Sequence, residues 1–480
     1  MSTKLSSGIS GLDEILDGGL PRNRSFLVSG GAGVGKTILG THFLLEETDG
    51  ESLFVTLGET ASQLRENADK LGLSLDNVDI LDLSPGGAED DGAIYSLLES
   101  WDVEGTAIHD QIVDRVRELN PARIFIDSIS HMRLLSSDAF QYRKQIMSML
   151  RKLTADGATV LFTAEQEKST EDAVLNFLSD GIIELQLTEH GRLCQIKKLR
   201  GSGFIEGCHF YSVHDTGLTL FPRLSPGEHG RSFALESISS GVPELDELTH
   251  GGIERGTVTL VSGPTGVGKT TLAAQYMKEA ASRGEYSVMY SFDESASTFF
   301  RRCAEISLPA QQMVETGNLK FEAIEPLHYN PDQLANMVRH DVEEKGARLV
   351  LLDSLSGYRQ SVRGADLQER VHALCRYLVN MGVTVLLINE TYSITGAEMR
   401  VTENGVSYLA DTIILLRYLE LSGEIRKTIG VLKKRTSDFE KTLREFRISA
   451  DGIKVGEPLT SLRGILTGMP EMLEDRGSLT

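Results

Sequence analysis

The residues Gly30–Thr37 read GGAGVGKT, and the residues Gly263–Thr270 read GPTGVGKT. Both follow the pattern G-x-x-x-x-G-K-[ST], and each comes directly after a short apolar run. In such a loop the backbone N–H groups fold around phosphate oxygens at the start of a helix. The two stretches therefore predict two nucleotide-binding loops. Their residues are Gly30, Gly31, Ala32, Gly33, Val34, Gly35, Lys36 and Thr37 in the first and Gly263, Pro264, Thr265, Gly266, Val267, Gly268, Lys269 and Thr270 in the second.

The loops belong to a longer internal repeat. Ser6–Thr37 (SSGISGLDEILDGGLPRNRSFLVSGGAGVGKT) recurs as Ser239–Thr270 (SSGVPELDELTHGGIERGTVTLVSGPTGVGKT), and the two loop lysines lie 233 positions apart. A period of that length indicates a duplicated whole domain rather than a solenoid. The segment Leu224–Arg231 (LSPGEHGR) has the composition of a linker, so we expect one domain in residues 1–230 and a second in residues 231–480.

Each half alternates short apolar runs with segments of helix length. Runs that are apolar on both faces of a strand are typical of a mostly parallel sheet covered by helices. The expected fold is therefore α/β, with two such domains in tandem. The runs are Ser25–Ser29, Leu53–Leu57, Arg123–Asp127 and Thr159–Thr163 in the first half, and Val258–Ser262, Val288–Phe292, Arg348–Asp353 and Val383–Ile388 in the second.

Composition narrows the class of protein. The 480 residues are 40% hydrophobic and 24% charged, which excludes a disordered or fibrous chain. There is no run of about 18 apolar residues and no apolar core of a signal peptide, so we expect a cytoplasmic protein with no membrane partner. Lys and Arg number 48 against 69 Asp and Glu, a net charge of −21. That charge repels phosphate backbones, and nucleic-acid binding is not expected without a local basic patch.

The loops also predict a magnesium site. The hydroxyls of Thr37 and Thr270 are expected to bind Mg²⁺, while the loop lysines reach the β- and γ-phosphates. Asp127 and Asp353 each end an apolar run and are each followed by serine. Because a buried carboxylate is costly without a partner, an acid there needs a cation or a strong hydrogen-bond network. Both are candidate metal ligands; the alternative is that each aspartate caps the helix that follows.

Hydrolysis of a nucleotide also needs a group that orients or deprotonates water. After the second apolar run the first half reads Gly58-Glu59-Thr60, and the second half reads Asp293-Glu294-Ser295. Glu59, Asp293 and Glu294 are therefore the candidate catalytic bases. The guanine-reading pattern [NT]KxD is absent from the sequence, so ATP is expected rather than GTP.

The duplicated S-S-G-x-x-x-L-D-E opening, the two loops, and the K-L-R-G-S and D-T-I-I-L-L segments resemble the KaiC family of circadian-clock ATPases and autokinases, within the RecA-like superfamily. The resemblance covers essentially the whole chain. It implies a homo-oligomer in the form of a hexameric double ring, with ATP held between neighbouring subunits. It also implies that Lys198-Leu199-Arg200 and Lys433-Lys434-Arg435 reach the neighbour's nucleotide, where cations can neutralise charge on the γ-phosphate. Without the resemblance, each cluster would be interpreted as a solvated edge.

The family's second domain phosphorylates itself on neighbouring Ser and Thr residues just before D-T-I-I-L-L. In this chain Ser407 stands at the serine position, Tyr408 replaces the threonine, and Thr402 matches a third hydroxyl upstream. The acceptor site is therefore half preserved. The family's first ring carries two adjacent glutamates where this chain has Gly58-Glu59, so either Glu59 takes over or the first domain hydrolyses ATP slowly.

Three function classes follow. The first is an ATPase and serine/threonine autokinase in signalling or clock-type regulation, whose downstream partner the sequence does not name. The second is an ATP-gated scaffold without kinase activity. The third is a RecA-like DNA-repair ATPase, for which Arg359 and Arg363 offer only a small basic patch. A salt-dependent gel shift with DNA discriminates the third class from the others.

Overall fold

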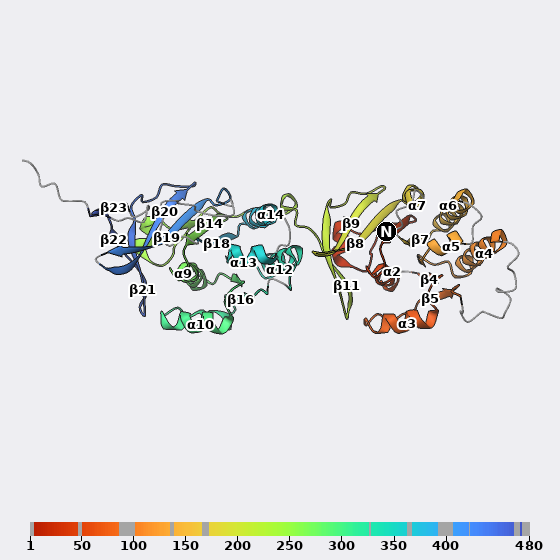
Figure 1. Ribbon diagram of the computed structural model, residues 1–480, viewed down its shortest axis with the longest axis horizontal. Helices are drawn as coiled ribbons and strands as arrows, with labels where there is room; N and C mark the ends of the chain where they lie inside the picture. The colour runs from red at the N-terminus through yellow and green to blue at the C-terminus, as the bar shows by residue number, and fades with distance from the viewer. Residues whose placement is uncertain are drawn as a thin grey trace, which may run out of the picture. The chain divides into compact units, whose positions relative to one another are not determined.

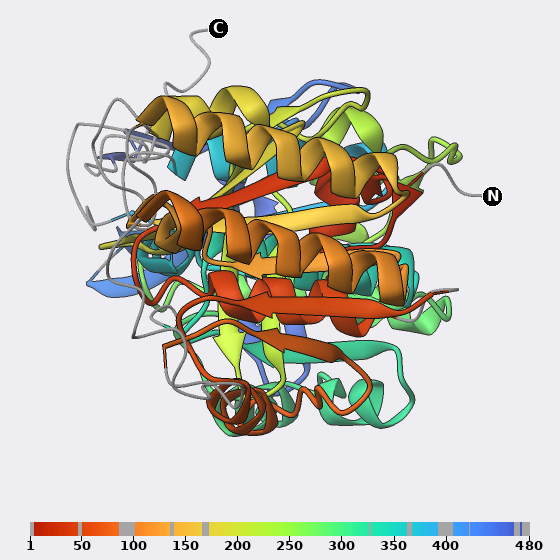
Figure 2. The same cartoon turned by 90° about the vertical axis from the view of Figure 1, so that its right-hand side faces the viewer.

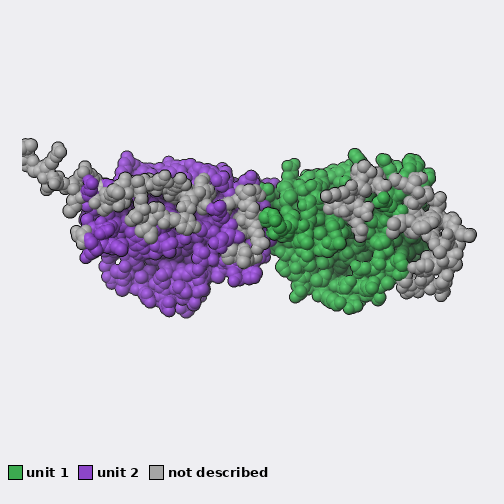
Figure 3. Space-filling view, in the orientation of Figure 1, with its two compact units in different colours: residues 1–223 green, residues 224–480 purple. Residues whose placement is uncertain are grey.

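The computed structural model describes residues 4–46, 50–85, 101–134, 139–165, 172–325, 328–361, 367–391, 407–421, 423–464 and 471–472. The chain divides into two compact units, Met1–Arg223 and Leu224–Thr480, which Figure 3 draws in different colours. Among the described helices, none combines the length and the apolar character that crossing a membrane requires.

The first unit is built on a nine-stranded sheet in the order β11-β10-β9-β8-β3-β7-β6-β4-β5. Figure 1 labels β11, β9, β8, β7, β4 and β5 among its strands. From β8 to β5 neighbouring strands run parallel, whereas β8, β9, β10 and β11 pair antiparallel. Its strands are β3 (Ser25–Gly30), β4 (Ser52–Thr56), β5 (Asp79–Asp82), β6 (Arg123–Asp127), β7 (Thr159–Glu165), β8 (Gly181–Thr188), β9 (Gly191–Leu199), β10 (Cys208–His214) and β11 (Gly217–Phe221). A separate hairpin pairs β1 (Lys4–Leu5) with β2 (Leu20–Pro21).

The second unit repeats this plan in the order β16-β15-β17-β18-β14-β19-β20-β21-β22. Neighbouring strands are parallel from β16 to β19 and antiparallel from β19 to β22. Its strands are β14 (Val258–Gly263), β15 (Ser287–Ser291), β16 (Leu319–Ala323), β17 (Leu349–Asp353), β18 (Thr384–Glu390), β19 (Thr412–Leu421), β20 (Glu424–Lys434), β21 (Arg444–Ser449) and β22 (Gly452–Pro458). Short hairpins pair β12 (Ser237–Ile238) with β13 (Ile253–Glu254) and β23 (Leu462–Arg463) with β24 (Glu471–Met472).

Helices cover the sheets, and α4 packs against α6 in the first unit (Figure 2). The helices of that unit are α1 (Ser10–Ile15), α2 (Lys36–Leu45), α3 (Ala61–Asp69), α4 (Trp101–Leu119), α5 (Ser130–Leu134), α6 (Ala139–Ala155) and α7 (Asp172–Leu178). Those of the second unit are α8 (Pro243–Leu248), α9 (Lys269–Ser282), α10 (Ala296–Glu305), α11 (Ala310–Glu315), α12 (Pro331–Glu343), α13 (Leu355–Ser361) and α14 (Leu367–Asn380), preceded by the 3₁₀ turn Pro226–Glu228.

The apolar runs are apolar on both faces because both faces of each sheet are covered. Along β6, Phe125 belongs to the core on one face, and Ile124 and Ile126 belong to the core on the other. All eight predicted runs lie in strands of the parallel part, within two residues of the predicted limits. The α/β prediction is thereby confirmed, and the antiparallel strands at one edge of each sheet are the part that it did not specify.

The segment expected as a linker, Leu224–Arg231, belongs to the second unit. The side-chain amide of Asn380, at the end of α14, donates to the carbonyl of Pro226 at 2.8 Å. The Arg231 N–H donates back to the Asn380 carbonyl at 2.9 Å. The segment is therefore held against α14.

Candidate functional site

Each phosphate-binding loop joins a central strand to a helix. The first loop leaves β3 at Gly30 and enters α2 at Lys36, and the second leaves β14 at Gly263 and enters α9 at Lys269. The residue before each helix is a glycine with a positive φ, +100° at Gly35 and +114° at Gly268. Residues with a side chain rarely adopt that conformation, so the turn that opens the helix N-terminus toward a phosphate requires glycine.

The loop lysines lie against their own loops. Nζ of Lys36 donates to the carbonyls of Gly30 and Gly31, at 2.8 Å each. Nζ of Lys269 donates to the carbonyl of Pro264 at 3.0 Å, and burial lowers the pKa of Lys269. Each ammonium group therefore lies against the loop whose N–H groups are the candidate phosphate donors.

The predicted metal residues meet in pairs. Oγ1 of Thr37 donates to Asp127 at 2.6 Å, and Oγ1 of Thr270 donates to Asp353 at 2.6 Å. The other carboxylate oxygen of Asp127 accepts from Thr163 at 2.5 Å. Burial raises the pKa of Asp353 to about 6. A buried carboxylate beside a hydroxyl is a hard-oxygen donor pair that a divalent cation would stabilise.

The Thr–Asp donor pairs fit a Mg²⁺ ion shared with substrate phosphates better than a metal ion whose ligands all come from the protein. Within the described ranges, three or more His, Cys, Asp or Glu side chains do not gather in a metal-binding arrangement. Mg²⁺ is commonly held by one or two carboxylates together with the phosphates of a substrate and water. One Thr–Asp pair in each unit is what such a site needs from the protein.

The two candidate glutamates have different partners. Glu59 is exposed, and its Oε2 accepts from Nδ2 of Asn67 at 3.1 Å. Glu294 forms a two-pronged ion pair with Arg302, at 2.6 Å and 3.2 Å. Asn67 and Arg302 each lie eight positions after the glutamate that they contact. The equivalent position therefore supplies a neutral amide in the first unit and a cation in the second.

The third candidate base, Asp293, lies beside the metal pair of the second unit. Its Oδ2 accepts from the hydroxyl of Ser354 at 3.0 Å, and Ser354 directly follows Asp353. The negative charge of Asp293 also contributes to the raised pKa of Asp353, after burial. Asp293 therefore lies beside the candidate metal ligand Asp353.

One residue of the site was missed in the sequence. Glu390 ends β18 in register with Gly263, and its Oε1 lies 3.7 Å from Nζ of Lys269 and 3.3 Å from Oγ1 of Thr265. The predicted run stopped two residues before this acid. A signal was present, because Glu165 ends the corresponding strand of the first half in register with Gly30.

The first basic cluster holds a chain turn together at the antiparallel edge. Nζ of Lys198 donates to the carbonyls of Asn176 and Ser179, at 2.8 Å and 2.7 Å. Arg200 lies 3.8 Å from Asp180 and remains 55% exposed. Leu199 is partly buried against the core.

The second cluster contacts the predicted phosphoacceptor segment. Nζ of Lys433 donates to the carbonyl of Ala410 at 2.6 Å and lies 3.4 Å from that of Ser407. Arg435 donates to the carbonyl of Tyr408 at 3.0 Å and is 51% exposed. The cations and the acceptor segment therefore share one edge of the second unit.

Of the acceptor hydroxyls, the structure describes one. Ser407 is half-buried, and the neighbouring Tyr408 is exposed, with its hydroxyl 3.4 Å from Nδ1 of His372. Thr402 lies outside the described residues, and so does Arg363, one of the two arginines considered for DNA binding.

Lys434 differs from its expected role at a neighbour's nucleotide. Its side chain is fully buried, with Nζ 2.8 Å from Glu254 and 3.0 Å from the carbonyl of Gly252, and it also donates to the carbonyl of Thr249. Because side chains alternate along β20, Lys433 points to one face of the sheet and Lys434 to the other. Lys434 therefore stabilises its own unit and is not available to another subunit.

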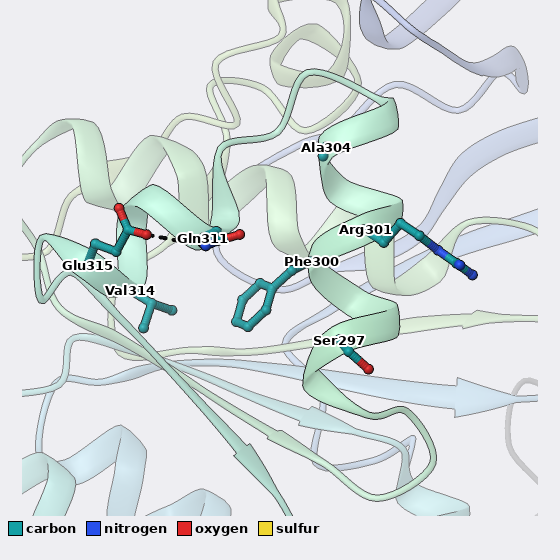
Figure 4. A pocket seen from close by; sticks show the side chains of 7 residues that line it. All are labelled: Ser297, Phe300, Arg301, Ala304, Gln311, Val314 and Glu315. Atoms are coloured by element: carbon teal, nitrogen blue, oxygen red, sulfur yellow. Dashed lines mark hydrogen bonds between the residues drawn. The ribbon is translucent and has the colours of Figure 1, made fainter.

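A hollow between α10 and α11 lies apart from these residues (Figure 4). It is lined by Ser297, Phe300, Arg301, Ala304, Gln311, Val314 and Glu315. Along α11, Gln311 donates to Glu315 at 3.3 Å. None of these residues belongs to the loops, the metal pairs or the basic clusters.

The sheets, the loops and the Thr–Asp pairs together define a protein of two tandem RecA-like P-loop domains. The family model described as "ATPase: KaiC" matches residues 5–225 and again residues 238–460. The chain belongs to this KaiC family of ATPases.

Curated relatives match over nearly their whole length. The circadian clock oscillator protein KaiC of Parasynechococcus marenigrum is 28% identical over 496 residues, covering 99% of this chain and 95% of the relative. That of Picosynechococcus is 30% identical over 484 residues, covering 97% and 92%. The circadian clock protein KaiC3 of Synechocystis is 30% identical over 484 residues, covering 97% and 94%.

Proposed function

We propose that each of the two domains, residues 1–230 and residues 231–480, binds one Mg²⁺-ATP and hydrolyses it. The observation that carries this proposal is the pair of 2.6 Å contacts, Thr37 with Asp127 and Thr270 with Asp353, each beside a P-loop lysine. The same arrangement formed twice in one chain is expected of two working nucleotide sites and is hard to explain as two helix caps.

In each site the loop N–H groups and the lysine bind the phosphates, and the Thr–Asp pair holds the metal. The metal, when bound, supplies positive charge to the β- and γ-phosphate oxygens. A carboxylate then orients the attacking water: Glu59 in the first domain, and Asp293 or Glu294 in the second. Since Arg302 already neutralises Glu294, Asp293 is the better placed base of the second site.

The assembly that we propose is a hexameric ring in the cytoplasm, with ATP between neighbouring subunits. Lys198 and Arg200 in one domain, and Lys433 and Arg435 in the other, would approach the neighbour's phosphates. The exposure of Arg200 and Arg435 supports this role, as does the recurrence of the same Lys-x-Arg contacts at both sheet edges. The names of the curated relatives support a role in signalling or clock-type regulation.

The second domain is further proposed to be a serine/threonine autokinase acting on Ser407, on Thr402, or on both. Lys433 and Arg435 contact the carbonyls of Ser407 and Tyr408, so an edge that reaches a neighbour's ATP would carry Ser407 with it. In the transfer, a bond forms between the serine oxygen and the γ-phosphorus. The bond to the bridging oxygen breaks, ADP leaves, and the hydroxyl proton passes to a carboxylate of that site.

Peptide mass spectrometry after incubation with Mg²⁺-ATP tests this proposal. We expect an adduct of about 80 Da, one PO₃ unit, on the peptides that contain Ser407 or Thr402. Lys269→Ala should abolish the adduct, and Lys36→Ala, the matched control, should mainly disturb ring assembly. Steady ADP release without an adduct would favour the ATP-gated scaffold. Unchanged phosphorylation of Lys269→Ala would contradict the assignment of kinase activity to the second domain.

A further inference from the structure

The end of β4 in the first unit carries a glycine where the second unit carries a catalytic candidate. A Cβ atom built on Gly58 would lie 3.2 Å from Cε1 and 3.5 Å from Nε2 of His131. The imidazole ring therefore lies directly beside position 58, and a side chain there would press against it. His131 comes from α5, the short helix that follows β6.

The ring is anchored through one nitrogen. Nδ1 of His131 lies 3.1 Å from the hydroxyl and 3.4 Å from the carbonyl of Ser128, the residue directly after the metal candidate Asp127. The ring is only half-buried, and in the part of the chain that the structure describes Nε2 has no hydrogen-bond partner. An Nδ1–H that donates to Ser128 leaves the lone pair of Nε2 free to accept a proton.

In the second unit the polar side chain stands after the strand, and the glycine stands in the helix that follows the metal aspartate. There Asp293 stands at the end of β15, and its carboxylate accepts from Ser354, the residue directly after Asp353. His131 is the third residue after its serine, and the third residue after Ser354 is Gly357. A Cβ on Gly357 would collide with that of Phe292 and would lie 3.5 Å from Oδ2 of Asp293.

The two units have thus exchanged a glycine and a polar side chain across one contact. The first unit pairs Gly58 with His131, and the second pairs Asp293 with Gly357. In both, the polar group contacts the serine that follows the metal aspartate. The polar side chain that approaches this serine is an imidazole in the first unit and a carboxylate in the second.

We propose that His131 is the proton-accepting residue for ATP hydrolysis in the first domain, in the place that Asp293 takes in the second. The inference rests on the proposed function, since it requires that the first domain hydrolyses ATP. The water oxygen bonds to the γ-phosphorus, the bond from γ-phosphorus to the bridging oxygen breaks, and ADP leaves. The water proton goes to Nε2 of His131 and then to solvent. Glu59, which accepts a hydrogen bond from Asn67, orients the water and does not accept its proton.

Two substitutions separate this role from a structural one. The background is full-length Lys269→Ala, so that ADP release reports the first domain. His131→Asn keeps a polar atom near the position of Nδ1 and can still bond Ser128, but it removes Nε2. His131→Gln places its amide near the position of Nε2 and is the matched control for side-chain size. A structural role tolerates the asparagine; a proton-accepting role does not tolerate either variant.

We expect His131→Asn and His131→Gln each to reduce the rate of ADP release by about 100-fold, the usual contribution of a general base. The affinity for a non-hydrolysable ATP analogue should stay within about twofold, because the loop and the metal pair are untouched. Nucleotide extracted from the purified variants should shift from ADP to ATP. Added imidazole should restore part of the rate to His131→Gly, whose missing ring leaves space at the serine.

The decisive variant copies the second unit into the first. The double variant Gly58→Asp with His131→Gly should release ADP at least about tenfold faster than His131→Gly alone. If His131→Asn releases ADP at the same rate as the Lys269→Ala background, the assignment of His131 is wrong. The ATPase proposal would stand. A Lys269→Ala background that binds the analogue but never releases ADP would overturn hydrolysis in the first domain, and the role of His131 with it.

Discussion

The buried aspartate of the second site should weaken the fold while it serves the nucleotide. Asp353 carries the carboxylate that we propose as a metal ligand, and burial raises its pKa from an ordinary value of 3.8 to about 6. Asp353→Asn keeps the shape of the side chain and an oxygen that can accept from Thr270, but it removes the charge. We therefore expect this variant to be more stable than the parent without nucleotide, and to gain much less stability from Mg²⁺-ATP.

The size of the effect follows from the pKa. At 1.36 kcal/mol for each tenfold change in proton affinity, a rise from 3.8 to about 6 corresponds to about 3 kcal/mol. Between these pH values the folded protein keeps a proton that the unfolded chain releases. Stability therefore falls as the pH rises from about 4 to about 6, and the full loss applies at pH 7. Asparagine carries no such penalty, so its gain at pH 7 should be about 2 to 3 kcal/mol.

The assay must resolve one unit, because a chain of two compact units need not unfold in a single step. Hydrogen exchange read by mass spectrometry on peptides of β17 and α9 gives the opening free energy of the second unit. Asp451→Asn is the matched control, because the carboxylate of Asp451 is exposed and pairs with Lys454 on the surface. It should leave the stability of the second unit unchanged, because solvent screens an exposed pair of this kind.

The pH dependence and the ligand provide independent checks. The parent should lose protection between pH 4 and 6 in the peptides of β17, whereas Asp353→Asn should show little change there. Saturating Mg²⁺-ATP at 100 times its Kd should add about 2.7 kcal/mol to the parent and much less to the variant. An Asp353→Asn protein that is less stable than the parent at pH 7 without nucleotide would show that the buried charge of Asp353 does not destabilise the second unit.

Three further predictions concern packing and charge. Gly40→Ala should destabilise the first unit by about 1 to 3 kcal/mol in hydrogen exchange, because its Cβ would collide with the buried ring of Phe125, and adding Phe125→Leu should relieve most of that loss. Lys434→Ala should cost about 3 kcal/mol in the second unit, with ATP affinity unchanged in a binding titration, since this lysine faces the interior. Arg302→Asn removes the cation paired with Glu294, and should raise ADP release by the second domain severalfold in protein whose first site is silenced.

Several features of the molecule could be predicted from the sequence because they depend on neighbours along the chain. The order G-x-x-x-x-G-K-T fixes a strand, a glycine turn and a helix start, and the structure has them at Gly30–Lys36 and Gly263–Lys269. The apolar runs mark strands because a sheet covered on both faces needs apolar residues in succession. The family could be named for the same reason, since its motifs are local and repeated.

Contacts between elements that are distant in the chain could not be predicted, because they form only when the sheet and its helices pack together. Lys434 looked like its neighbour Lys433, yet the pleat of β20 turns it toward Glu254. Gly58 is interpreted from the sequence as the loss of a catalytic base. Nothing in the residues around it indicates that the imidazole of His131, from α5, lies directly beside it. A sequence pattern shows which side chains a segment carries, but not which of them come into contact once the sheet has formed. The chemistry of a site depends on those contacts.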